Sequence, residues 1–336
     1  MSLKSLLTTY LPAIEDEMQR VVSLSRTPQT EPLYNMLAYH LGWQGENAAA
    51  ARGKRIRPAL VLLFTQALGA NWQTALPAAA AVELLHNFSL IHDDIEDNSP
   101  TRRGRATLWT LHGIPQAINA GDALFTLAHL ALTRLEETTS AQTAWRANLL
   151  VQRTSLALTQ GQYLDMTYEN ERSLPLEAYY PMVGGKTAAL LAACAELGAL
   201  CAAADEPTQA ACRTYGEKLG LAFQIQDDIL GIWGDPQITG KSAASDLLAG
   251  KKSLPVLYGL QQGGAFAERW LQGALAEDEV TQAAAELQAA GAKDDAQAQA
   301  AALSAQALAA LQQANPQGEA AQALYELTEE LLKRKA

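Results

Sequence analysis

A chain of 336 residues with 49% hydrophobic content can bury a sizeable core, as one large domain or two. Aromatic residues reach only 6% and Ala is abundant, which favours closely packed helices over sheets. The net charge of -11 argues against non-specific nucleic-acid binding, so local basic groups are expected to serve a small anion.

Apolar residues recur with helical spacing along most of the chain, and no run shows the alternation of a strand. In chain order the pattern predicts helices over residues 11–24, 33–41, 59–68, 74–92, 115–137, 141–168, 187–204 and 209–231. Residues 104–113 are expected to form a loop. The Ala-rich region 268–336 predicts two or three peripheral helices without visible chemistry.

A basic segment, Gly53-Lys54-Arg55-Ile56-Arg57-Pro58, precedes the helix expected over 59–68. Pro58 suits a first helical position. Lys54 and Arg57 lie three residues apart around this helix start, where backbone N–H groups also favour anions. An ordinary basic loop explains this segment, taken alone, equally well.

The apolar run 74–92 ends in an acidic cluster that contains Asp93, Asp94 and Asp97. Asp93 and Asp97 are spaced i and i+4, so they share one helical face and repel each other. Such a face is tolerated where a hard divalent cation binds. The segment from Arg102 to Arg105 then places three cations directly after the acids.

A second acidic pair, Asp227-Asp228, also follows an apolar stretch and precedes basic residues. Two carboxylate pairs of this kind suit a di- or triphosphate held through Mg²⁺, which prefers a few carboxylates, phosphate oxygens and water. Gly184-Gly185-Lys186-Thr187 is compatible with phosphate binding. Because the segment lacks P-loop spacing and a preceding strand, it does not indicate a nucleotide site.

The three cysteines, Cys194, Cys201 and Cys212, show no C-x-x-C spacing and no nearby His, which is typical of reduced core residues. The first 18 residues do not resemble a signal peptide. The apolar window 187–204 carries Glu196 and predicts a core helix, not a membrane span. We therefore expect a cytoplasmic protein without stable membrane insertion.

Six motifs in this order and spacing resemble the trans-isoprenyl diphosphate synthase, or polyprenyl synthetase, family over roughly residues 53–255. They are G-K-R-x-R-P at Gly53–Pro58, His86, D-D-x-x-D at Asp93–Asp97, R-R-G at Arg102–Gly104, K-T at Lys186–Thr187 and F-Q-x-x-D-D at Phe223–Asp228. The resemblance implies a single all-α domain over 1–336, a helical bundle around a central cavity with the isoprenoid synthase type I fold. An Ala-rich helical region over 264–336 follows the motifs.

The resemblance also implies head-to-tail condensation of isopentenyl diphosphate with an allylic diphosphate by a homodimer that uses three Mg²⁺ ions per active site. Asp93, Asp94 and Asp97 would bind Mg²⁺ on the allylic diphosphate, and Asp227 would hold a further ion, with Asp228 as another candidate ligand. Three further roles are implied. The allylic diphosphate would be contacted by Arg102, Lys186 and Lys241, and isopentenyl diphosphate would be bound by Lys54, Arg57, His86 and Arg103. The allylic cation would be contacted by Thr187 and Gln224.

The second aspartate motif departs from the family pattern, because Gly231 stands at its fifth position where D-D-x-x-D has Asp. Gly231 and Gly234 make a helix that continues to Asp235 doubtful. Asp227 is therefore the principal ligand expected here, with Asp228 and Asp235 in an outer shell. Lys251 resembles a further phosphate-facing lysine.

Product length is expected to depend on the cavity below the first aspartates. Residues about one helical turn before Asp93 are expected to line this cavity. In this family a large residue five positions before the first Asp acts as a floor. Phe88 holds that position here, next to Ser89, with Leu85 one turn further back. This combination resembles C20 synthases and predicts geranylgeranyl diphosphate. Farnesyl diphosphate, a longer product, or Phe88 as ordinary core packing are the alternatives.

Two other functions are compatible with an aspartate-rich helix. A class I terpene cyclase would need Asn, Ser/Thr and Glu at four-residue steps, and Asn170, Ser173 and Glu177 miss that spacing. A non-catalytic subunit of a heteromeric synthase is expected to lose aspartates, whereas both acidic motifs of this chain keep their Asp-Asp pair. Catalytic prenyl transfer is therefore favoured.

Overall fold

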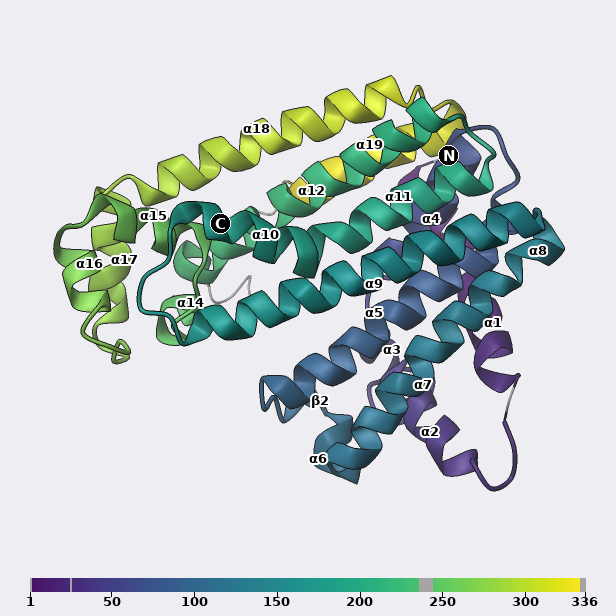
Figure 1. Ribbon diagram of the computed structural model, residues 1–336, viewed down its shortest axis with the longest axis horizontal. Helices are drawn as coiled ribbons and strands as arrows, with labels where there is room; N and C mark the ends of the chain where they lie inside the picture. The colour runs from purple at the N-terminus through teal and green to yellow at the C-terminus, as the bar shows by residue number, and fades with distance from the viewer. Residues whose placement is uncertain (1, 25, 236–243, 333–336) are drawn as a thin grey trace. The chain divides into compact units, whose positions relative to one another are not determined.

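The computed structural model describes residues 2–24, 26–235 and 244–332 (Figure 1). Within these residues the secondary structure is helical apart from one short hairpin, which confirms the all-α prediction. Contacts group the chain into two compact units. Unit 1 comprises Met1–Gln152, Cys194–Asp205 and Pro316–Leu324, and unit 2 comprises Arg153–Ala193, Glu206–Asn315 and Tyr325–Ala336. The single domain over 1–336 stays a prediction.

Unit 1 is built around α5 (Leu76–Glu96) and α7 (Ile114–Thr133), which lie side by side (Figure 1). Ala78 to Ala81 in α5 are all fully buried, so this helix is covered on every side. The other elements that lie wholly in unit 1 are α1 (Leu3–Ser23), α2 (Glu31–His40), α3 (Ala48–Ala51), α4 (Ile56–Ala67), η1 (Trp72–Ala75), β1 (Thr101–Arg102), β2 (Arg105–Ala106), α6 (Leu108–His112) and α8 (Leu135–Thr138).

The loop predicted over 104–113 is wrong in part. Strands β1 and β2 pair antiparallel, with Arg102 opposite Arg105. Arg103 and Gly104 both have positive φ, at 52° and 74°, as the two-residue turn of a right-twisted hairpin requires. Strands of two residues are too short to show an alternating pattern, so they could not be predicted from the sequence. The second half of the expected loop forms α6.

Unit 2 is built around α12 (Glu206–Trp233) and α18 (Ala292–Gln313), which also lie side by side (Figure 1). The other elements that lie wholly in this unit are η2 (Leu176–Ala178), α10 (Tyr179–Val183), the π-helical turn η3 (Gly184–Ala188), α14 (Ser245–Leu248), α15 (Leu254–Gln262), α16 (Gly264–Trp270) and α17 (Val280–Ala289). Three helices have residues in both units, namely α9 (Ala141–Glu169), α11 (Ala189–Cys201) and α19 (Gly318–Leu332).

Two expectations about unit 2 are wrong. Helix α18 is not peripheral, because Ala292, Ala296 and Ala300 are fully buried and the last two belong to a core cluster of the unit. Their small side chains permit close helix packing but give little amphipathic signal. Helix α12 does not end at Gly231, since it continues to Trp233. Asp235 lies beyond that helix.

Two stretches, 72–96 and 176–201, are long and apolar enough by composition to cross a membrane. Of their most apolar windows, 72% and 67% are buried inside the protein. Buried core helices have the same composition, so this finding is weak evidence for a span.

Candidate active site

The first acidic cluster lies at the carboxyl end of α5, and its three carboxylates differ in exposure. Asp93 is half-buried, and Asp97, the C-cap residue, is exposed. Asp94 is only 2% exposed, and the Arg102 Nε donates to its Oδ1 at 2.7 Å. Burial raises the pKa of Asp94, while the Arg102 charge and hydrogen bond oppose that rise. The helix therefore turns Asp94 toward protein and leaves Asp93 and Asp97 nearer to solvent.

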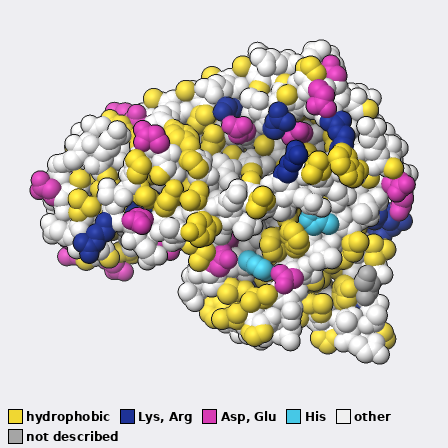
Figure 2. All heavy atoms as spheres, in the orientation of Figure 1, with side chains coloured by type: hydrophobic (Ala, Val, Ile, Leu, Met, Phe, Trp, Pro, Cys, Tyr) yellow, Lys and Arg dark blue, Asp and Glu magenta, His cyan; other side chains and the backbone are white. Residues whose placement is uncertain are grey.

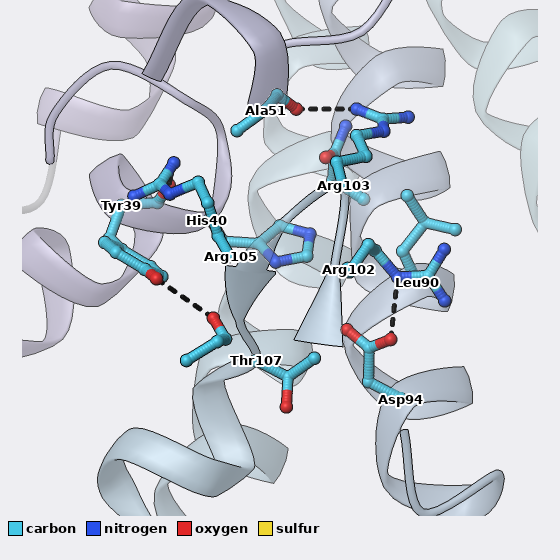
Figure 3. Close-up of a pocket in the computed structure, with 11 residues that line it drawn as sticks. Tyr39, His40, Ala51, Leu90, Asp94, Arg102, Arg103, Arg105 and Thr107 are labelled. Atoms are coloured by element: carbon cyan, nitrogen blue, oxygen red, sulfur yellow. Dashed lines mark hydrogen bonds and ion pairs between the residues drawn. The ribbon is translucent and has the colours of Figure 1, made fainter. Parts of the chain in front are cut away.

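Figure 3 shows the small pocket in unit 1 that Asp94 faces, together with Arg102 and other basic residues of the hairpin. Arg105 on β2 is a structural member of this group. Its guanidinium stacks 3.7 Å from the centroid of the Tyr39 ring and donates to the carbonyls of Tyr39 and Gln44. Among Arg102, Arg103 and Arg105, it is therefore Arg105 whose contacts hold the hairpin against α2.

The basic segment before α4 alternates between accessible and buried cations. Lys54 is exposed and Arg57 is half-buried. Arg55 between them has a left-handed backbone, with φ of 48°, and is 4% exposed. It donates to Glu15 Oε1 at 2.8 Å and to Glu83 Oε1 at 2.7 Å. The role of Arg55 could not be predicted from the sequence, because its acidic partners are distant along the chain.

His86 joins the basic group in unit 1. Its Nε2 lies 3.3 Å from Arg57 Nη1. Burial, followed by the charges of Arg57, Arg103 and Arg102, lowers the pKa of His86 well below its usual range. Arg103 donates from Nη1 to the Ala51 carbonyl at 2.6 Å. A neutral His86 therefore lies with Arg57 and Arg103 in one basic group.

The second acidic pair lies on α12 in unit 2, and it repeats the pattern of the first. Asp227 is half-buried, whereas Asp228 is 6% exposed. Asp228 Oδ2 accepts from Tyr179 Oη at 2.7 Å and from the Leu254 backbone N–H at 3.1 Å. Burial raises the pKa of Asp228 to about 6, against the effect of its hydrogen bonds. In each pair the second aspartate is thus held by protein groups and the first is more accessible.

Gln224 lies one turn before Asp228 on α12. Thr187 of η3 contacts it within unit 2. Thr187 Oγ1 donates to Gln224 Oε1 at 3.0 Å, and Gln224 Nε2 donates to Asp228 Oδ1 at 3.0 Å. This chain of hydrogen bonds fixes the orientation of the Gln224 amide. It also links the K-T element to the second aspartate motif.

Lys186 and Thr187 belong to the π-helical turn η3, a feature that often marks functional sites. Lys186 Nζ forms an ion pair with Asp165 of α9. The turn packs tightly on α9, because a Cβ added at Gly161 would overlap the Lys186 backbone nitrogen and lie 2.6 Å from the Gly185 carbonyl carbon. The sequence predicts Lys186 but not this turn.

Two further basic residues were predicted to bind phosphate. Lys241 lies outside the described residues. Lys251 is exposed, and its Nζ lies 3.4 Å from Asp246 Oδ1 of α14.

The donor set fits Mg²⁺. Within residues 2–24, 26–235 and 244–332, no group of three or more His, Cys, Asp or Glu side chains is arranged to hold a metal ion. Mg²⁺ does not require one, because it keeps several waters and takes phosphate oxygens beside one or two carboxylates. Asp93 and Asp97 in unit 1 and Asp227 in unit 2 supply such carboxylates.

The predicted floor residue, Phe88, is part of an aromatic cluster between α5 and α7. Its ring centroid lies 5.1 Å from that of Phe125 and 4.8 Å from that of His92, and Phe125 lies 4.8 Å from His129. Of the other chain-length candidates, Leu85 is fully buried and Ser89 is half-buried. Phe125 was missed, because it lies on a different helix from the motif.

An all-α protein with two aspartate pairs and two sets of basic residues has the composition of a metal-dependent enzyme that acts on diphosphates. Comparison with known proteins agrees with this class. The sequence profile of the polyprenyl synthetase family matches residues 43–290. The chain belongs to this family and is a trans-prenyltransferase that elongates prenyl diphosphates.

Two relatives come from Mycobacterium tuberculosis H37Rv. A (2E,6E)-farnesyl diphosphate synthase is 42% identical over 75% of this chain and 69% of its own length. A geranylgeranyl diphosphate synthase is 46% identical over 68% of this chain and 66% of its own length. Relatives with different products thus show similar identity, so identity does not decide the product length.

Solved structures confirm the fold. The polyprenyl synthetase from Streptomyces coelicolor A3(2) is 36% identical and superposes with a TM-score of 0.87, over 98% of this chain and 100% of that chain. The polyprenyl synthase from Caulobacter crescentus CB15, solved with calcium and isoprenyl diphosphate, is 28% identical, with a TM-score of 0.81 over 99% of this chain and 98% of that chain.

Proposed function

We propose that this enzyme condenses isopentenyl diphosphate head to tail with dimethylallyl, geranyl and farnesyl diphosphates, and that its main product is geranylgeranyl diphosphate. The observation that carries the proposal is the pairing, in one chain, of accessible carboxylates for a metal-bound diphosphate with a separate group of cations for a second diphosphate. A terpene cyclase has no need for the second group, since it takes a single substrate.

Mg²⁺ bound to the allylic diphosphate would neutralise the charge that accumulates as the C–O bond ionises. Asp93, Asp97 and Asp227 are the proposed ligands. Asp94 and Asp228 instead hold the helix ends in place, because their oxygens accept hydrogen bonds from Arg102 and from Tyr179. A calcium-bound family structure supports a divalent cation, while three Mg²⁺ ions per site stays a proposal.

The protein side chains supply binding, orientation and charge. Lys54, Arg57, His86 and Arg103 hold the isopentenyl diphosphate without metal, and Arg102, Lys186, Lys241 and Lys251 bind the allylic diphosphate. A neutral His86 donates a hydrogen bond without adding charge. The allylic cation forms near Thr187 and Gln224, whose oxygens stabilise it. The double bond of the second substrate then attacks this cation, a new C–C bond forms and a proton is lost.

The C20 product is proposed because Phe88, five residues before Asp93, is aromatic and is packed against a second aromatic ring. The Phe125 ring of α7 packs against Phe88 and supports it as the floor of the proposed chain cavity. Farnesyl diphosphate is the second candidate, supported by the 42% identical farnesyl diphosphate synthase. Removal of the Phe88 ring enlarges the space below the aspartates, so Phe88→Ala is expected to lengthen the product under either alternative.

The test is the size of the product. The purified protein with Mg²⁺ is given isopentenyl diphosphate and, separately, C5, C10 and C15 allylic primers, and the dephosphorylated alcohols are sized. We expect mainly C20 alcohol from every primer and longer alcohols from Phe88→Ala. A C15 product, with farnesyl diphosphate inert as a primer, would establish farnesyl diphosphate synthesis instead.

The proposed metal site is tested with Asp93→Ala. The loss of this carboxylate is expected to lower kcat/KM about a hundredfold or more, on the scale of other charge-stabilising groups. The exposed Asp278→Asn of unit 2 is the matched control. Near-wild-type turnover in folded Asp93→Ala would contradict the proposed mechanism.

We further propose a cytoplasmic homodimer. Leu111, Ile114 and Ile118 are 49%, 47% and 40% exposed, and Figure 2 shows apolar side chains gathered over α6 and the start of α7. Large apolar groups that cluster on a surface mark interaction sites. The three cysteines are buried and form no disulfide with one another, and they have the properties of core residues in a reducing compartment.

A further inference from the structure

Gly231 stands one helical turn after Asp227 on α12, at the fifth position of the second aspartate motif. Residues spaced i and i+4 share a face of a helix, with Cβ atoms about 5 to 6 Å apart. In the first motif of this chain the equivalent positions are both carboxylates, Asp93 and Asp97. The second motif therefore lacks one carboxylate on the face that carries Asp227.

The space of the missing side chain is filled from another helix. If Gly231 had a Cβ, it would overlap Oδ2 and Cγ of Asp246, and it would lie 3.1 Å from Asp246 Oδ1. Asp246 belongs to α14 and is 6% exposed. Its carboxylate thus lies where the side chain of residue 231 would begin. Only Gly at 231 leaves room for this arrangement.

We propose that Asp246 supplies the carboxylate that the second aspartate motif lacks at position 231, and that Asp227 and Asp246 together bind the divalent cation of unit 2. This inference rests on the proposed function of the site. Two carboxylates suffice for Mg²⁺, whose remaining ligands are phosphate oxygens and water.

The contact of Asp246 with Lys251 agrees with this role. Lys251 Nζ lies 3.4 Å from Asp246 Oδ1, and the Lys251 side chain is 57% exposed. The ion pair places a positive charge beside the carboxylate. Because the lysine side chain is exposed, its ammonium can turn to a phosphate oxygen when a metal ion binds. The alternative is that Asp246 only holds the loop of Lys251 in place.

The experiment measures binding of Mn²⁺ in the presence of inorganic pyrophosphate by isothermal titration calorimetry. It uses the Asp93→Asn/Asp97→Asn background, which removes the metal ligands of unit 1. In that background Asp246→Asn is expected to weaken Mn²⁺ binding about tenfold or more, the range seen when groups that support a metal are lost. Asp278→Asn is expected to leave it unchanged.

A relocated carboxylate separates metal binding from a purely structural role. Asp246→Gly is expected to bind Mn²⁺ weakly, and Gly231→Asp/Asp246→Gly to regain most of the affinity, because the carboxylate returns to the helix. Gly231→Asp alone brings two carboxylates into one space and is expected to lower the melting temperature.

Two outcomes would overturn the proposal. One is Mn²⁺ affinity in Asp246→Asn equal to that of the background protein, and the other is a double variant that binds no better than Asp246→Gly. Product formation by the wild-type protein with Mg²⁺ is measured separately. A failure of the proposed function therefore appears as absent prenyl product, whereas a failure of this inference appears in the Mn²⁺ affinities.

Discussion

Neighbouring basic residues before α4 have opposite roles, and burial decides which role each one takes. The side chain of Arg55 is almost completely buried and pairs with two buried carboxylates, Glu15 and Glu83. Arg55→Met would remove the close cation from both carboxylates, while Arg52 Nε would remain 4.0 Å from Glu15 Oε1. Loss of one partner of a buried ion pair costs about 3 to 5 kcal/mol, so we expect a loss of this size in the free energy of urea unfolding at pH 7.

The neighbouring cation provides the control for that measurement. Lys54→Met changes an exposed side chain and is expected to alter the unfolding free energy by no more than about 0.5 kcal/mol, while raising the KM for isopentenyl diphosphate. If Arg55→Met unfolded like the wild type, the buried network would not support the fold as the geometry indicates.

The candidate site residues could be predicted from the sequence where a motif is local. Asp93 with Asp97, and Lys54 with Arg57, follow from spacing along one helix or around one helix start. Burial of individual members could not be predicted, because it depends on residues far along the chain. Asp94 and Asp228 look equivalent to their neighbours in the sequence, yet Arg102 and Tyr179 respectively hold them.

At the level of elements, the π-helical turn η3 depends on two glycines at its contact with α9. A Cβ at Gly161 would overlap the backbone of Lys186 and would come within 2.9 Å of Gly185 Cα. Gly161→Ala must therefore push the turn away and move Lys186. We expect a loss of about 1 to 3 kcal/mol in unfolding free energy, as in other overpacked sites, and a higher KM for the allylic substrate.

Gly184→Ala, in the same turn, is the matched control. Its backbone is right-handed helical, with φ of -55° and ψ of -47°, and a Cβ there meets no atom within 4 Å. The substitution is expected to leave KM unchanged and to stabilise the protein by up to about 1 kcal/mol. Equal effects of the two substitutions would refute the packing argument for Gly161.

Several long helices were predicted closely, whereas elements set by tertiary packing were not, and α1 begins at Leu3, eight residues before its predicted start. The sequence pattern predicts α9 over 141–168, and the helix spans Ala141–Glu169. It does not predict the hairpin, whose strands have two residues each. It also predicts a peripheral position for α18, which is partly buried, because the Ala and Gln residues of α18 show almost no contrast between apolar and polar faces. Gly231 was expected to end a helix, but its close contact with Asp246 explains the glycine instead.

At the level of the whole molecule, a half-buried histidine, His40, whose Nε2 atom is buried, links stability to pH. Burial, and then the charges of four arginines led by Arg102, lower the pKa of His40 to about 3. The unfolded chain binds a proton near pH 6.5, so it gains protons before the folded state does. Stability from this group is full above pH 6.5 and is lost as the pH falls toward 3, by about 1.4 kcal/mol per unit.

The pH dependence is checked by urea unfolding of wild-type protein and His40→Gln. Between pH 6.5 and 4.5 the wild type is expected to lose about 2 to 3 kcal/mol more than the variant. The exposed His112→Gln is expected to follow the wild-type profile. Parallel profiles for the wild type and His40→Gln would show that His40 is not held neutral.

The exposed apolar side chains of α6 and α7 make the oligomeric state a property that one substitution can test. Ile118 follows Ile114 by one turn on α7, so both lie on the same face. If this face is the dimer interface, Ile118→Asp places an unpaired charge in it, which costs several kcal/mol and separates the subunits. Sedimentation equilibrium should then give twice 36.0 kDa for the wild type and 36.0 kDa for the variant. Leu271→Asp, with 43% exposure in unit 2, should remain a dimer, and a dimeric Ile118→Asp would place the interface on another face.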